Sequence, residues 1–300
     1  MWPNYQRIGN IMEHLYDRSM EDTGNIIAFE HVNTRVPDQL LATIFYLTGL
    51  GLTRDPYVMP HVTNMWVNIG GSQFHLPTGS PQVLGGHVGI IVPSLEALRD
   101  RMASVKPLLE GTRYNARETS QYLELTSPWG NVYRCFEAPP EPGSVVLGVK
   151  YVQQDVAVGL AAAIARFYRE VLGARADVAD DGEGVAAHVA TGSGQTLRFR
   201  EKTGPLPPFD GAHLAIYLSD FSRPYRWLLE RGLITEESGQ HQYRFQKIVD
   251  VDGGEALTVL EHEVRSLKHP FYGRQLVNRD VSQTSRRYVP GRDNFSCRRA

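Results

Sequence analysis

The sequence predicts an α+β protein with two tandem domains, each built from two units in which a strand and a helix precede up to three further strands. Segments rich in β-branched and aromatic residues alternate with helical segments along most of the chain. The motif Phe-Tyr, three residues, Leu-Gly closes a helical segment at residues 45–51 and again at 167–173, 122 positions later. Strands carrying His31, His87 and His213 open new units. Internal repetition of this kind indicates the fold more strongly than any single motif.

The first predicted domain spans residues 26–138. The helix of its first unit is opened by Pro37 and ended by Gly49, because proline suits the first helical turn and glycine the end of a helix. In the second unit Ser94 is the expected N-cap. The predicted strands lie at 26–32, 64–69, 72–76, 87–92, 122–126 and 132–136, with weaker ones near 52–58 and Arg113, and the helices lie at 37–47 and 94–102.

The second predicted domain spans residues 145–267 and opens with the same order of elements. A proline-rich linker at 139–144 precedes it. Residues 1–25 are expected to form an N-terminal arm, and the basic tail at 268–300 an extended arm over the domains or a neighbouring subunit. The first strand and the alanine-rich helix of this domain are predicted at 149–152 and 156–172.

The composition is that of an ordinary globular protein, with 42% hydrophobic residues, 21% charged residues and a formal net charge of −2. This balance argues against nucleic acid or an anionic membrane as a partner. No run approaches the roughly 20 apolar residues that cross a bilayer. Cys135 and Cys297 are far apart in the sequence, so no disulfide framework is expected and a reducing, cytoplasmic location fits. The expected partner is a small-molecule substrate.

The repeated units and the Phe-Tyr-x-x-x-Leu-Gly motif resemble the vicinal oxygen chelate superfamily. Its members include glyoxalase I, fosfomycin- and bleomycin-resistance proteins and the extradiol ring-cleaving dioxygenases. The resemblance covers roughly residues 26–138 and 145–265. It implies that two units curl their sheets around a cup, where residues from the first and last strands of each unit hold a divalent metal such as Fe²⁺, Zn²⁺, Ni²⁺ or Mn²⁺.

In the first domain, the resemblance places metal ligands at His31, His75 and His87. The fourth position, counted from the Gly130-Asn131 turn, falls on Arg134 instead of a carboxylate. Glu137 lies three residues later, on the opposite face of a regular strand. Arg134 and Glu137 are therefore expected to complete or modify the site as catalytic residues.

The second domain departs further from the family pattern. Tyr151 stands where His31 stands in the first domain, and His213 matches His87, whereas Glu261 lines up with Glu137 and not with the metal carboxylate. An iron site is not expected in this domain, which would serve for packing or for a homodimer. The histidine in the charged stretch at 261–263, His262, is expected to be exposed.

Three functions follow from the resemblance. The first is a metal-dependent enzyme, most naturally an extradiol dioxygenase, an oxidoreductase acting on a catecholic or related oxygen-rich substrate. The second is a glyoxalase-like lyase or isomerase. The third is a metal-free binding protein for resistance or sequestration, in which Arg134 grips an anionic ligand bidentately.

Overall fold

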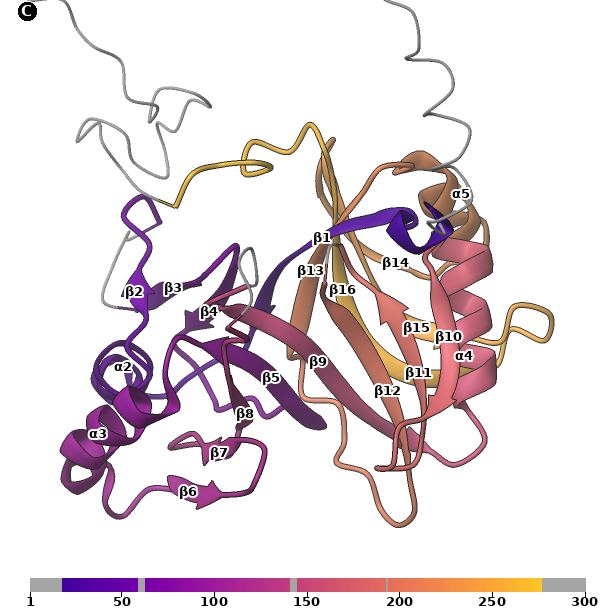
Figure 1. Ribbon diagram of the computed structural model, residues 1–300. Helices are drawn as coiled ribbons and strands as arrows, with labels where there is room; N and C mark the ends of the chain where they lie inside the picture. Colours follow the sequence, from indigo (N-terminus) through magenta and orange to yellow (C-terminus); the bar gives the residue numbers. More distant parts are fainter. Residues whose placement is uncertain (1–17, 59–62, 141–144, 193, 277–300) are drawn as a thin grey trace, which may run out of the picture.

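Two eight-stranded mixed sheets form the body of the molecule, with helices at both of its ends (Figure 1). The computed structural model describes residues 18–58, 63–140, 145–192 and 194–276. Most of the predicted N-terminal arm, much of the linker and most of the basic tail therefore lie outside the described residues. No helix in the described part of the chain is long and apolar enough to span a membrane.

The four predicted units are present in order, and each has a first strand, a helical segment and three further strands. A short helix, η1 (Arg18–Glu21), precedes them. Units one and two consist of β1 (Ile26–Asn33), α2 (Gln39–Ala42), η2 (Thr43–Gly49), β2 (Thr53–Arg54), β3 (Asn64–Ile69), β4 (Ser72–Pro77), β5 (Gly86–Val92), α3 (Leu95–Val105), η3 (Lys106–Leu109), β6 (Asn115–Glu118), β7 (Leu123–Thr126) and β8 (Val132–Glu137). Units three and four consist of β9 (Gly148–Ala157), α4 (Ala161–Phe167), η4 (Tyr168–Leu172), β10 (Ala176–Asp180), β11 (Val185–Ala190), β12 (Thr196–Lys202), β13 (His213–Leu218), α5 (Ser222–Glu230), β14 (Ile234–Gly239), β15 (Gln242–Val249) and β16 (Ala256–Ser266).

Local chemistry explains where the helices begin and end. The Asp38 carboxylate accepts hydrogen bonds from the backbone N–H groups of Leu40 and Leu41, which caps α2. The Ser94 hydroxyl caps α3 in the same way, as the sequence predicts. Gly173 ends η4 at φ 69°, a left-handed conformation that favours glycine.

Each sheet joins units from different halves of the chain. The first sheet has the strand order β14-β15-β16-β13-β1-β4-β3-β2, and the second has the order β10-β11-β12-β9-β5-β8-β7-β6. The antiparallel pairs β1–β13 and β5–β9 form the two centres. Unit one thus shares a sheet with unit four, and unit two with unit three, which differs from the expectation that units one and two curl around one cup. The first strand of every unit has an edge with unpaired backbone groups, and the first strand of any other unit can pair with it. The pattern of residues within the strands therefore does not determine which two units pair.

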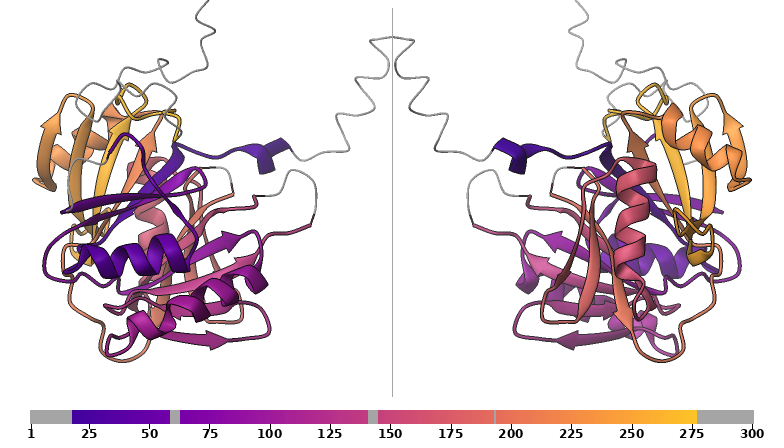
Figure 2. Two further views of the ribbon diagram at one scale, coloured as in Figure 1. Left: turned by 90° about the vertical axis from the view of Figure 1, so that its left-hand side faces the viewer. Right: turned by 90° about the vertical axis from the view of Figure 1, so that its right-hand side faces the viewer.

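The helices, in contrast, pack within each half of the chain (Figure 2). The buried Tyr46 hydroxyl of η2 lies 2.6 Å from that of Tyr133 on β8, so the helix of unit one contacts the last strand of unit two. In the second half, the Tyr168 hydroxyl of η4 lies 2.6 Å from Nε2 of His262 on β16. The ring of His262 is fully buried, so the expectation that it is exposed is wrong. Successive side chains of a strand point to opposite faces of the sheet. His262 therefore faces the helices, and Glu261 and Glu263 face the other side.

Candidate metal centre

Three buried side chains converge on one face of the first sheet. His31 comes from β1, His213 from β13 and Glu263 from β16, and one possible ligand atom of each lies within 4.8 Å of the others. Two imidazoles and one carboxylate form the ligand set of the two-histidine, one-carboxylate metal sites, which leave coordination positions open. Residues far apart in the sequence thus meet because β1 and β13 pair at the centre of the sheet.

The strand register relates these residues by an approximate twofold symmetry. His31 pairs with Ala215, and Asn33 pairs with His213, so the two histidines hold equivalent positions on their strands. In the neighbouring parallel pairs, Asn33 lies opposite His75, and Ala215 lies opposite Glu263. His75 and Glu263 are therefore also equivalent. We call the face lined by His31, His75, His213 and Glu263 the first cup.

His75 occupies the fourth position but is held by other partners. Its ring stacks on Trp66 at 3.9 Å between centroids and lies 5.8 Å from the ring of His31. Its Nδ1 accepts a hydrogen bond from the Asn33 amide at 2.6 Å, and its Nε2 donates to Asn64 at 2.8 Å. Because both ring nitrogens are engaged, His75 supports the centre. His31 and His213 each have a ring nitrogen without a hydrogen-bond partner among the described residues, and a Glu263 oxygen lies close to both.

His31 provides the strongest sign of a missing partner. Its side chain is fully buried, and neither ring nitrogen has a hydrogen-bond partner among the described residues. Nε2 of the neighbouring His213 also has none. Leaving a buried polar group without a partner costs about 1–3 kcal/mol. A divalent metal would accept these nitrogen lone pairs, so the residues fit such an ion.

The protonation states of the ligands favour a cation. Burial raises the pKa of Glu263, but its contact with His213 and the charges of Arg265 and Arg244 outweigh burial, so the pKa falls well below its usual range. Burial lowers the pKa of His213 despite the nearby carboxylate. Burial, followed by the neighbouring His31, lowers the pKa of His75 to about 2. An ionised carboxylate beside neutral imidazoles is the form that binds metals.

Arginines orient the carboxylates around the centre. The guanidinium of Arg244 donates to Glu261 at 2.7 Å and also to Glu263. Arg265 pairs with both Glu263 and Glu30, and the Glu30 carboxylate lies 3.8 Å from Nδ1 of His31. Such outer partners fix the geometry of metal ligands.

A cavity of about 550 Å³ opens beside the first cup. Glu30, whose carboxylate lies close to His31, forms part of the wall of this cavity. The segment after β16 forms another part: Arg274 donates to Asp55 at 2.8 Å and to Gln73 at 3.2 Å. The cavity is lined by Ala28, Phe29, Glu30, Gly70, Gly71, Gln73, Tyr217 and residues 271–276. A small molecule bound there would contact Glu30 and Gln73, the two neighbours of His31 along its strand and across the sheet.

The structure divides the three predicted histidine ligands between the two sheets. His31 and His75 lie in the first cup, whereas His87 lies on β5 of the second sheet, where its Nε2 is 3.1 Å from the Tyr151 hydroxyl. The predicted set of His31, His75 and His87 is therefore not brought together, because unit one pairs with unit four and not with unit two.

The predicted catalytic residues also lie away from the first cup. Arg134 lies on β8 of the second sheet, and Glu137, at the exposed end of the same strand, accepts a hydrogen bond from the Leu95 backbone N–H. Neither His213 nor Glu263 is among the ligands that the sequence analysis predicts. A signal for them is present in the sequence, since His213 opens its unit as His31 and His87 open theirs. Glu263 lies on the last strand of unit four as Arg134 does in unit two.

Comparison with solved structures identifies the same architecture elsewhere. A protein from Bacillus subtilis subsp. subtilis str. 168, described as a "putative dioxygenase", matches with a TM-score of 0.55 and 16% identity, over 84% of this chain and 92% of its own. Glyoxalase I from Zea mays matches with a TM-score of 0.55 and 14% identity, over 84% of this chain and 95% of its own. At these identities the likeness establishes the fold. No protein-family model and no curated protein matches the sequence.

Proposed function

We propose that this chain, which has the fold of the vicinal oxygen chelate superfamily, is a metal-dependent enzyme that acts on an oxygen-rich small molecule. The observation that carries the proposal is His31, whose buried ring nitrogens lack hydrogen-bond partners among the described residues and lie beside His213 and Glu263. These three residues would hold the metal. Bound there, a divalent ion would supply Lewis acidity toward substrate oxygens and, as Fe²⁺, a site for O₂.

Within this proposal, ring-cleaving dioxygenation of a catecholic substrate is the leading reaction. The two-histidine, one-carboxylate set is the one that non-haem iron oxygenases use. The cavity beside Glu30 offers room for an aromatic ring, and Tyr217 lines it. Burial raises the pKa of Tyr217 far above its usual range, so its hydroxyl stays protonated and can donate a hydrogen bond to a substrate oxygen.

A second reaction, a glyoxalase-like lyase or isomerase, is favoured by His75. This residue stands at the position equivalent to Glu263, and a turn of its ring away from Asn33 and Asn64 would add a fourth protein ligand. A fuller ligand set leaves fewer open positions, which suits Lewis-acid chemistry on one substrate better than joint binding of a substrate and O₂.

Metal analysis followed by oxygen uptake tests the proposal. The protein is expressed with Fe, Zn, Ni and Mn supplied, and the metal content is measured by mass spectrometry for wild type, His31→Ala and Glu263→Ala. We expect about one equivalent in wild type and a large loss in both variants. Oxygen consumption with a panel of catechols then separates the two reactions: uptake supports the dioxygenase, and a metal-loaded protein without uptake supports the lyase. A wild-type protein free of metal under these conditions would refute both and leave the metal-free binding protein.

A further inference from the structure

The second sheet repeats the geometry of the first cup with a different set of side chains. His87 pairs with Gln153, and Gly89 pairs with Tyr151, so His87 and Tyr151 hold the positions of the two first-cup histidines. In the flanking parallel pairs, Gly89 lies opposite Arg134, and Gln153 lies opposite Arg198. Both positions that carry His75 and Glu263 in the first cup thus carry arginines. We call the face lined by His87, Arg134, Tyr151 and Arg198 the second cup.

The second cup is built for negative charge and not for a cation. A cavity of about 190 Å³ opens at this cup, and Lys150 lines it together with the two arginines. Burial, followed by the positive charges of Arg134 and Arg198, lowers the pKa of His87 to about 3, and burial with the charge of Arg198 lowers the pKa of Lys150.

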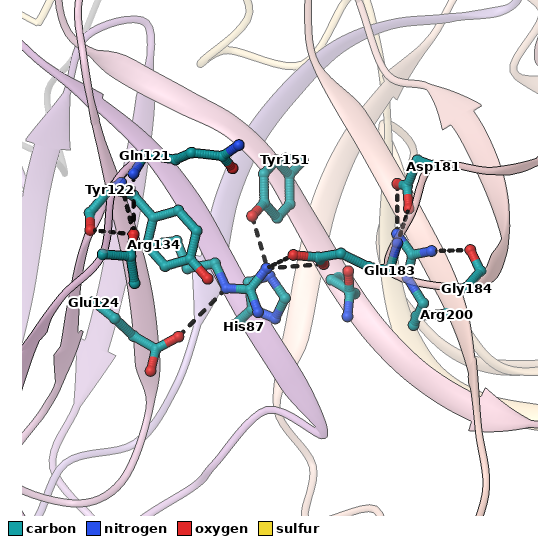
Figure 3. Close-up of polar contacts among 12 residues, drawn as sticks. His87, Gln121, Tyr122, Glu124, Arg134, Tyr151, Asp181, Glu183, Gly184 and Arg200 are labelled. Atoms are coloured by element: carbon teal, nitrogen blue, oxygen red, sulfur yellow. Dashed lines mark hydrogen bonds and ion pairs between the residues drawn. The ribbon is translucent and has the colours of Figure 1, made fainter.

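Two carboxylates of the protein already engage Arg134 in this cup, and the first, Glu124, accepts a hydrogen bond from its Nε at 3.4 Å. Glu183, in the turn between β10 and β11, accepts two hydrogen bonds from Nη1 of Arg134, at 2.7 and 2.9 Å (Figure 3). Its side chain is 46% exposed and reaches in from solvent. The other acid in the turn, Asp181, pairs with the buried Arg200. Glu183 therefore marks where an anion lies, and its carboxylate is the group that a bound anion would replace.

Arg198 has no carboxylate partner among the described residues. Its guanidinium lies 3.8 Å from the centre of the Tyr151 ring, and its buried Nε has no hydrogen-bond partner in the described part of the chain. Lys150 lies over the ring of Phe136 at 4.4 Å. The carboxylate group of an aromatic acid that entered the cup would contact Arg198 directly. The ring of that acid would lie beside the aromatic side chains that line the cavity.

We propose that the second cup binds a small aromatic carboxylate, with the carboxylate group on Arg134 and Arg198 in place of Glu183 and the ring against Tyr122, Phe136 and Tyr151. Bidentate pairing suits a guanidinium and a carboxylate. The metal-binding residues of the first cup take no part in this site, so the proposal stands independently of the proposed enzyme activity.

Isothermal titration of the full chain with benzoate tests the site, with benzamide as the neutral analogue. Wild type should bind benzoate saturably and benzamide much more weakly. Glu183→Ala removes the competing internal carboxylate from an exposed turn and should tighten benzoate binding severalfold. Arg198→Met should weaken it by about tenfold or more, because a charge-assisted pair is lost. Arg99→Met, at an exposed ion pair with Glu118, is the matched control and should bind as wild type does.

Several results would overturn the proposal. The proposal fails if neither wild type nor Glu183→Ala binds benzoate saturably. It also fails if benzamide binds as tightly as benzoate. Binding that survives in a folded Arg198→Met or is lost in His31→Ala would place the ligand elsewhere, the latter in the first cup. If Arg198→Met does not fold, Arg198→Lys keeps the charge without the bidentate fork and should weaken binding, and the Glu183→Ala result stands by itself.

Discussion

Mild acid should destabilise the protein through His262. Its buried ring stacks on Phe245 at 4.5 Å, its Nδ1–H donates to the Leu260 carbonyl at 2.7 Å, and its Nε2 accepts from the Tyr168 hydroxyl. A proton on Nε2 would place a positive charge in this fully buried site, and Nε2 could no longer accept from the Tyr168 hydroxyl. Burial accordingly lowers the pKa of His262 from 6.5 to about 4.

The sign and size of the effect follow from this depressed pKa. The unfolded chain binds the proton near pH 6.5, whereas the folded protein binds it only near pH 4, so stability falls as the pH drops through this window. At 1.36 kcal/mol for each pH unit, the complete loss is about 3 kcal/mol, of which about 1 kcal/mol falls between pH 7.0 and 5.5.

Urea unfolding followed by circular dichroism at pH 7.0 and 5.5 measures this loss in wild type and in His262→Gln. Other buried histidines, His75 and His87, shift stability in the same direction, so only the difference between the two proteins isolates His262. We expect wild type to lose about 1 kcal/mol more than the variant. An equal loss in both proteins would refute the reasoning.

Three further predictions concern the core and the metal. Tyr133→Phe leaves the buried Tyr46 hydroxyl without its partner and should lower the free energy of unfolding by about 1–3 kcal/mol in urea titrations, whereas an unchanged midpoint would contradict that pairing. Arg265→Met leaves Glu30 and Glu263 without their shared cation and should cost about 3–5 kcal/mol by thermal unfolding, and a variant as stable as wild type would disprove this. Chelation should lower the Tm, and free metal at about 1,000 times its Kd should restore about 4 kcal/mol, so a Tm insensitive to both would argue against a bound ion.

The repeated units were predictable from the sequence because their signals are local. The Phe-Tyr-x-x-x-Leu-Gly motif places Tyr46 and Tyr168 at equivalent points, and in the structure each contacts the last strand of the next unit. The Ser94 cap likewise depends on neighbours in sequence. Such features are set by short-range geometry, so they can be read without knowledge of the tertiary pairing.

The composition of the site depends on which first strands pair, and nothing local encodes that choice. Reading units one and two as one cup placed His87 beside His31, whereas β1 pairs with β13 and brings His213 and Glu263 instead. The strand register places Tyr151 at the position on its strand that the sequence predicts, equivalent to that of His31. This residue lies in the second cup, however, together with His87. Alignment of the four units to one another would have placed Glu263 with Arg134 and indicated the carboxylate.

The most direct test of the central claim compares the metal content of His213→Ala with that of His87→Ala. Both substitutions remove a buried histidine from the first strand of a unit, one in each cup. If His31, His213 and Glu263 hold the metal, His213→Ala should lose it while His87→Ala keeps about one equivalent. Loss of metal in His87→Ala, with retention in His213→Ala, would contradict the account.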